Sequence, residues 1–296
     1  MSEFDFLEPI PKTVMTVELP SRGVPYPDAS PQKAGKLTLS PMTMIEENMV
    51  LNQNNTKKQG DVIDKVISRC LQERIDLNTL LGADKFFLFM MLRAITYGPE
   101  YTFNWTCPAP VGREVCNTKN TRTVLIPDDF MVKKLADEDT EPFKVTLPNC
   151  QKEIAFRLLR GFDEPEIEKH EEEIKEQQKQ GIIIPDTTPA YRLARHVVAV
   201  DGKDVQDAPI DLLVKFIASL DAKDGQELRT KINYFTPGIE TGVTLVCSEC
   251  GTRHEWVLPI TADFFRSGTT EEREPVGNEV RPDVLPGVGV QRGDAR

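Results

Sequence analysis

Two pairs of cysteines limit the ways in which this chain can fold. The second pair, Cys247 and Cys250, lies within the run GVTLVCSECGTRHEW, where β-forming residues stand on both sides of the cysteines. Gly251 follows the pair directly, and glycine allows the backbone to turn tightly there. This pattern is typical of a zinc knuckle, a hairpin whose tip offers two thiolates to a metal ion.

A structural zinc ion takes four ligands, so one knuckle leaves such a site incomplete. The first pair, Cys107 and Cys116, follows another β-rich run, YTFNWT, and encloses a proline and a glycine that suit a turn. Eight residues separate these two cysteines, which is more than in a usual knuckle. We expect the four cysteines to share one structural zinc ion. His254 is the alternative to Cys116 as the fourth ligand.

The competing interpretation of Cys247 and Cys250 is a redox dithiol. Such a motif usually opens a helix in a β–α–β unit, whereas a glycine and a β-rich run follow here. Residues 1–8 are acidic and lack the form of a signal peptide, so we expect folding in a reducing cytoplasm. Clustered cysteines in that compartment indicate metal binding more than disulfides. Cys70 is expected to be a buried free thiol, and Cys150 is assigned no role.

Charge and motifs argue against several classes of function. The 296 residues carry a net charge of -11, which opposes non-specific binding to nucleic-acid phosphates and to an anionic membrane surface. No apolar run approaches the roughly 20 residues that a membrane-spanning helix needs. The sequence has no G-x-S-x-G, no phosphate-binding glycine loop and no H-E-x-x-H. We therefore expect no enzymatic activity, and protein partners rather than nucleic acid, membrane or a small-molecule substrate.

Helical periodicity and turn residues predict a mixed, α+β fold. The most apolar stretch, residues 83–97, is predicted to be the central buried helix. Other helices are predicted over 43–51, 60–70, 165–180, 190–200, 210–219 and 224–235, with Ser40 and Asp163 as the N-caps of the first and third. The helix over 165–180 is so charged that we expect most of its surface, with His170, to be solvated. His196 is expected in the core or at an interface.

The chain repeats several short landmarks. Residues 17–20 (VELP) match residues 145–148 (VTLP), and residues 124–130 match residues 258–264. Asp84 and its helix precede Cys107 as Asp224 and its helix precede Cys247, and residues 39–43 with Glu46 resemble residues 159–163 with Glu166. We predict two related β–helix–hairpin halves joined by a zinc-ribbon-like site near a pseudo-twofold axis. The predicted segments are an N-terminal arm (1–13), a first half (14–142), a second half (143–266) and a flexible C-terminal tail (267–296).

Several motifs together resemble the T-even phage baseplate hub protein family. They are VELPSRGVPYP at 17–27, LSPMT at 39–43, RAITYG at 93–98, the cysteine knuckle, and DFF at 263–265. The resemblance covers roughly residues 14–266. It implies a non-enzymatic component of a contractile tail baseplate, found in the virion and assembled in the host cytoplasm.

Three functions compete at this stage. The first is a structural baseplate component of the hub or wedge region that binds other phage tail proteins. The second is an assembly chaperone or adaptor that is absent from the mature virion. The third is a zinc-ribbon nucleic-acid-binding protein, which the charge disfavours because Glu240, Glu249 and Glu255 outnumber Arg253 and Lys231 near the second cysteine pair.

Overall fold

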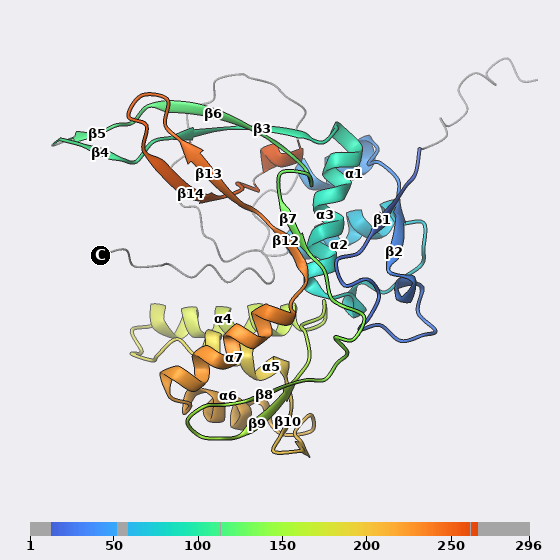
Figure 1. Cartoon of the computed structure of the whole chain (residues 1–296), viewed down its shortest axis with the longest axis vertical. Coiled ribbons are helices and arrows are strands. Elements are labelled where there is room, and N and C mark those ends of the chain that lie inside the picture. The colour runs from blue at the N-terminus through green and yellow to red at the C-terminus, as the bar shows by residue number, and fades with distance from the viewer. Residues whose placement is uncertain (1–12, 52–58, 113, 261, 266–296) are drawn as a thin grey trace, which may run out of the picture.

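The computed structural model describes residues 13–51, 59–112, 114–260 and 262–265 (Figure 1). These residues form seven α-helices and fourteen short strands, and all of their strand pairings are antiparallel. The expectation of a mixed helix-and-strand fold is therefore confirmed. The predicted arms, 1–13 and 267–296, lie outside the described residues except for Thr13. Below, residues 13–142 are called the first half and residues 143–265 the second half.

The first half begins with a strand pair and ends with a long hairpin. Its elements are β1 (Met15–Glu18), η2 (Pro31–Ala34), β2 (Lys36–Leu39), α1 (Met44–Leu51), α2 (Gln59–Cys70), η3 (Leu77–Thr79), α3 (Gly82–Tyr97), β3 (Glu100–Thr106), β4 (Pro110–Val111), β5 (Glu114–Val115), β6 (Lys119–Leu125) and β7 (Met131–Lys133). β1 pairs with β2 so that Val17 lies opposite Leu37, and both side chains are buried. β3 pairs with β6 along its whole length.

The second half builds a four-stranded sheet and ends with a shorter hairpin. Its elements are β8 (Phe143–Thr146), β9 (Glu153–Phe156), α4 (Glu164–Lys179), α5 (Thr188–His196), β10 (Val197–Val200), β11 (Lys203–Asp204), α6 (Ile210–Ala218), α7 (Ala222–Phe235), β12 (Gly238–Glu240), β13 (Gly242–Val246), β14 (Arg253–Val257) and η4 (Ala262–Phe265). The sheet has the order β11-β10-β9-β8. Phe235 of α7 stacks on Phe143 of β8, with ring centroids 4.3 Å apart. Aromatic packing of this kind fixes the helix against the sheet.

The helix α3 is the centre of the hydrophobic core, as its apolar sequence predicts. Its buried side chains include Phe86, Phe87, Leu88, Phe89, Met90 and Leu92. The ring of Phe89 lies 5.8 Å from that of Phe264 and 4.8 Å from that of Phe265. The last element of the second half, η4, therefore packs against the central helix of the first.

Figure 1 shows where the cysteine hairpins lie relative to the two groups of helices. Helices α1–α3 with β1 and β2 form one group, and α4–α7 with β8–β10 form the other. The hairpins β3–β6 and β13–β14 both extend beside the first group, although β13–β14 comes from the second half. The last hairpin of the second half thus lies beside the first group of helices. The strand β12, which precedes this hairpin, pairs with β7 of the first half.

Two predicted capping interactions and one predicted helix end were wrong, although α1 and α4 each begin within one residue of the predicted start. Thr43 rather than Ser40 caps α1: its hydroxyl accepts from the Ile45 N–H at 3.3 Å, while its own N–H donates to Glu46 at 2.9 Å. Asp163 stands at the N-cap position of α4, but its backbone angles are helical and its side chain makes no capping hydrogen bond. The helix predicted over 190–200 ends at His196, because the β-branched run that follows forms β10 beside β9.

The prediction of a solvated His170 holds only in part, because the side chain is partly exposed and also makes contacts within the protein. Its ring stacks on that of Tyr191 with centroids 4.2 Å apart, and its Nε2 lies 2.9 Å from Thr187 Oγ1. These contacts join α4 to α5. The expectations for His196 and Cys70 are confirmed, since both side chains are buried.

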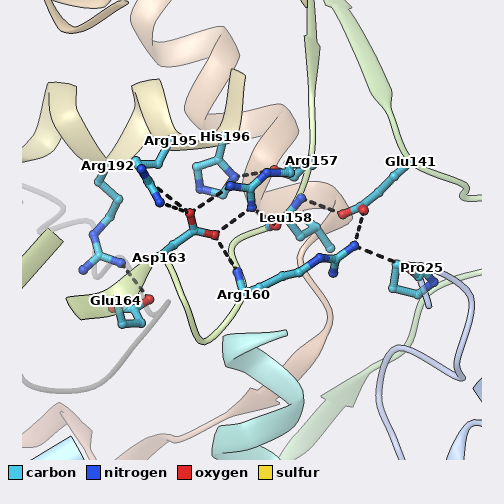
Figure 2. Close-up of polar contacts among 10 residues, drawn as sticks. All are labelled: Pro25, Glu141, Arg157, Leu158, Arg160, Asp163, Glu164, Arg192, Arg195 and His196. Atoms are coloured by element: carbon cyan, nitrogen blue, oxygen red, sulfur yellow. Dashed lines mark hydrogen bonds and ion pairs between the residues drawn. The ribbon is translucent and has the colours of Figure 1, made fainter. Parts of the chain in front are cut away.

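The two halves interlock through the segment that leads into α4. The Gly82 N–H donates to the Leu159 carbonyl at 3.2 Å, and the Gly161 N–H donates to the Leu80 carbonyl at 2.8 Å. Arg160 adds a hydrogen bond from Nη2 to the Pro25 carbonyl at 3.2 Å. Figure 2 shows that the same guanidinium also contacts Glu141, so this segment is tied to the first half by both backbone and side chain.

Asp163 is the buried carboxylate at the centre of this segment. Arg157 and Arg195 both pair with it, with N–O distances of 2.7 Å and 2.8 Å (Figure 2), and the Arg160 N–H donates to it at 2.9 Å. Each of its oxygens is therefore engaged by a cation, as a buried charge requires.

A matching arrangement surrounds Glu46 in the first half. Its carboxylate accepts from Arg69 Nε at 2.8 Å and from the Thr43 N–H at 2.9 Å. In both halves the acceptor lies three residues after the N–H donor, and the arginine stands at the penultimate position of a helix, α2 or α5. The contacts of Glu46 thus resemble those of Asp163 and not those of Glu166, the residue that its sequence surroundings match.

Candidate metal centre

The four cysteines of the two pairs lie together at the tips of the two hairpins. Cys107, Cys116, Cys247 and Cys250 place their Sγ atoms within 4.8 Å of one another. Cys107 and Cys247 are buried, while Cys116 and Cys250 are partly exposed. The expected juxtaposition of the pairs is therefore present.

Two sulfur–sulfur distances are close to those around a tetrahedral ion. Across the hairpins, Cys107 Sγ lies 3.6 Å from Cys250 Sγ, and Cys116 Sγ lies 3.8 Å from Cys247 Sγ. A tetrahedron with metal–sulfur bonds of about 2.3 Å has edges of about 3.8 Å. The cluster can accept a thiophilic divalent ion with little movement.

A small inserted hairpin explains the long spacing of the first pair. β4 and β5 pair within the eight intervening residues, and the Cys116 N–H donates to the Ala109 carbonyl at 2.8 Å. The two ends of the insertion therefore lie side by side. As a result, Cys116 lies beside Cys107 just as Cys250 lies beside Cys247.

Apart from this insertion, several backbone features match at the two cysteine pairs. The Cys107 N–H donates to the Thr118 carbonyl at 3.0 Å, and the Cys247 N–H donates to the Thr252 carbonyl at 3.1 Å. The residues after the second cysteines, Asn117 and Gly251, both have positive φ, +52° and +66°. Asparagine and glycine are the residues that adopt this conformation most readily.

Side chains beyond the cysteines also contact the sulfurs, and the sequence analysis does not predict these contacts. Thr118 Oγ1 lies 3.1 Å from Cys116 Sγ, and Thr252 Oγ1 lies 3.3 Å from Cys250 Sγ. The signal was available, because the second cysteine of each pair begins a similar run, CNTKN at 116–120 and CGTRH at 250–254.

His254 is placed next to the cluster but outside it. Its Nε2 lies 3.3 Å from Cys107 Sγ, yet its ring nitrogens do not belong to the group of mutually close ligand atoms. Its ring packs edge-on against Trp105, with centroids 5.6 Å apart. The fourth member of the group is therefore Cys116 and not His254.

The two buried thiols differ in how easily they ionise. Burial raises the pKa of the Cys107 thiol to about 12. Backbone N–H groups, first that of Cys250, lower the pKa of the Cys247 thiol to about 6. The turn between Cys247 and Cys250 thus stabilises negative charge on sulfur, as a metal-binding knuckle requires.

The remaining cysteines lie elsewhere. Cys70 is buried at the end of α2, and Cys150 is exposed in the loop after β8. Neither belongs to the four-sulfur group. Within the described ranges, no helix combines the length and the hydropathy needed to cross a bilayer.

Comparison with known proteins identifies the family. A family model described as "T4 bacteriophage base plate protein" matches residues 10–266, a span that contains both cysteine hairpins. Comparison with curated proteins and with solved structures gave no match. Because the matched span covers most of the sequence, this chain belongs to the T4 bacteriophage base plate protein family.

Proposed function

We propose that this chain is a structural, non-enzymatic component of a contractile phage tail baseplate, in its hub or wedge region. The match to the base plate family over residues 10–266 carries this proposal. The chain acts by binding other tail proteins, and its place is the virion tail after assembly in the host cytoplasm.

In this proposal one zinc ion binds Cys107, Cys116, Cys247 and Cys250. The fit of the sulfur spacing to a tetrahedron supports it. An ion held by four thiolates has no open position for water, so its role is structural and not catalytic. It ties the last hairpin of the second half to the last hairpin of the first, in a zinc-ribbon-like arrangement.

The proposal also includes two related halves, residues 14–142 and 143–266, flanked by arms over 1–13 and 267–296 that contact neighbouring proteins. The matching hydrogen bonds at the hairpin tips, and around Glu46 and Asp163, support a common origin for the halves. Shared polar contacts at equivalent places are a stronger sign of relatedness than short sequence matches, because each contact needs both the residue and its environment.

Mass spectrometry of purified phage particles tests the structural assignment. A baseplate component is recovered with the particles at a fixed ratio to other tail proteins after extensive washing. An assembly chaperone is present in the infected cell and absent from the particles. A salt-sensitive shift of DNA or RNA in a mobility assay would instead favour the nucleic-acid-binding alternative.

Elemental analysis of the purified, reduced chain tests the metal. The expected result is one zinc ion per chain. Loss of the ion from Cys116→Ser, but not from Cys150→Ser, would support the shared site.

A further inference from the structure

The side chains around the four sulfurs follow a similar pattern in the two hairpins. Asn120, four residues after Cys116, directs Nδ2 at Cys247 Sγ across the hairpins, at 3.7 Å. His254, four residues after Cys250, directs Nε2 at Cys107 Sγ across the hairpins, at 3.3 Å. Each hairpin therefore contacts the buried cysteine of the other.

The strand pairing explains why these two residues reach across. Asn120 lies opposite Trp105 in β3–β6, and His254 lies opposite Leu245 in β13–β14. Their strand partners, Trp105 and Leu245, each lie two residues before the buried cysteine of the same hairpin. Because strand residues alternate between faces, each side chain projects on the face that meets the other hairpin.

Together with the two threonines, these residues give every sulfur one polar partner. Cys116 and Cys250 are contacted by Thr118 and Thr252 of their own hairpins, whereas Cys107 and Cys247 are contacted from the opposite hairpin. A metal-bound thiolate has no proton, so it can only accept hydrogen bonds. Hydroxyl, amide and imidazole N–H groups then all act as donors.

We propose that Asn120 and His254 are positioning residues that hold Cys247 and Cys107 for metal binding and stabilise the charge of the four-thiolate centre. This inference rests on the proposed metal site. A divalent ion with four thiolates carries a net charge of -2, which donors placed around the sulfurs offset. The threonines orient the thiolates within each hairpin, and Asn120 and His254 set one hairpin relative to the other.

Asn120 makes three further hydrogen bonds that hold its amide in place. Its Oδ1 accepts from the N–H and from the hydroxyl of Ser248, both at 2.9 Å, and its Nδ2 also donates to the Thr118 carbonyl at 2.9 Å. The amide therefore fixes the residue that follows Cys247. His254 is held instead by the edge of its ring against Trp105.

The test is binding of Co2+ and Zn2+ to the full-length chain, by competition with a chelator and by the sulfur-to-cobalt charge-transfer bands. Asn120→Asp keeps the acceptor for Ser248 but replaces the donor to Cys247 with an oxygen. His254→Phe keeps a ring against Trp105 but has no donor, and His254→Gln restores an N–H. Thr121→Val is the matched control, since Thr121 lies on the same strand and its hydroxyl contacts Asn104.

We expect Asn120→Asp and His254→Phe each to weaken Zn2+ binding by about 10- to 100-fold, the usual range for outer-sphere partners of a metal site. Both should also shift the charge-transfer bands, and His254→Gln should recover most of the affinity. Wild-type binding with a four-sulfur spectrum that none of these variants alters would overturn the inference and leave the metal site intact. Absence of metal from the wild-type chain would overturn the metal site itself, and the inference with it.

The rate at which the thiols react with an alkylating reagent gives a second readout if one variant folds poorly. Zinc-bound thiolates that lose a hydrogen-bond donor become more nucleophilic. We expect His254→Phe to be alkylated faster than His254→Gln. Equal rates for these two variants and the wild type would contradict the proposed role.

Discussion

Asp84 and Asp224 make the same contact in the two halves. Asp84 Oδ1 accepts from the Ser21 N–H at 3.0 Å, and Asp224 Oδ1 accepts from the Asn149 N–H at 2.7 Å. Each donor directly follows the proline that ends a Val-x-Leu-Pro run, and each aspartate stands in the first turn of a helix, α3 or α7. The carboxylate thus fastens a helix start to the loop after a strand.

The environments of the two aspartates nevertheless differ. Burial raises the pKa of Asp84, which is sealed in the core beside Tyr26. Burial also acts on Asp224, but the N–H groups of Asn149 and Cys150 outweigh it and lower the pKa of that carboxyl. Asp84 is therefore the residue whose loss leaves buried donors without a partner.

The first prediction follows from that burial. Asp84→Ala removes the acceptor for the Ser21 N–H and for the Tyr26 hydroxyl, and we expect it to lower the free energy of unfolding by about 2–4 kcal/mol. Urea denaturation measures the change. Asp207→Ala, at an exposed position, is the control and should stay within about 0.5 kcal/mol of the wild type. An equally small effect of Asp84→Ala would show that the contact does not stabilise the core.

The second prediction concerns the close packing of the two halves at Gly161. A Cβ added there would lie 2.5 Å from the Leu77 carbonyl oxygen and 2.9 Å from the Asn78 Cα. Backbone atoms cannot move away as a flexible side chain can, so Gly161→Ala should lower the free energy of unfolding by about 1–3 kcal/mol. Gly242→Ala is the matched control, because a Cβ there meets no atom within 4 Å. Similar stabilities for the two variants would exclude a tight contact at Gly161.

The apolar sequence of α3 was sufficient to predict the central helix, because a stretch so rich in phenylalanine and leucine has no stable exposed state. The location of the four cysteines at hairpin tips also followed from local chemistry, in which β-forming residues and a glycine flank Cys247 and Cys250. In both cases a short stretch determines its own structure.

Other features depended on contacts between distant residues. Residues 197–200 directly follow a helix, and they form a strand through pairing with β9 and β11. Asp163 has the sequence position of an N-cap, but Arg157 and Arg195 recruit it into an ion pair instead. The matching runs after Cys116 and Cys250 place Asn120 like His254, but they do not show that Asn120 contacts Cys247, which lies 127 residues away. In these cases, residues that are distant in the sequence determine the local structure. Hydrophobic periodicity carries no information about such contacts.

The third prediction is a pH dependence of stability that His196 causes. Burial lowers the pKa of His196 to about 4, from an ordinary value near 6.5, and its Nδ1 donates to the Arg157 carbonyl at 2.7 Å. Between these two pH values the unfolded chain binds a proton that the folded chain does not. Stability therefore falls as the pH falls from about 6.5 to about 4, by up to about 3 kcal/mol for this group.

Comparison with His196→Gln isolates the contribution of this histidine. Glutamine keeps an N–H for the Arg157 carbonyl but does not titrate. Urea denaturation at pH 7, 5.5 and 4 should show a smaller loss of stability for the variant than for the wild type. Parallel profiles would mean that His196 titrates equally in the folded and unfolded chains. Glu46 contributes to the pH dependence at lower pH. Burial raises its pKa, but the hydrogen bonds from Thr43 and Arg69 outweigh burial and hold the pKa at about 2.

The last prediction concerns metal removal. If one ion joins the hairpins, then chelation should release both of them together, because each supplies only two of the four ligands. Hydrogen exchange should then increase in β3, β6, β13 and β14, while α3 stays protected by its buried side chains. The melting temperature should also fall, since binding to the folded state alone stabilises it.

Cys116→Ser and Cys250→Ser should have an effect similar to removal of the metal by a chelator. Each leaves three thiolates, so each should raise exchange in both hairpins and not only in its own. Cys150→Ser, outside the cluster, should leave the exchange of both unchanged. The hairpins meet through Asn120 and Ser248 as well as through the sulfurs, so some protection should survive at their contact. If Cys116→Ser loosened only β3–β6, the hairpins would be independent, and the ion would not be what couples the two halves.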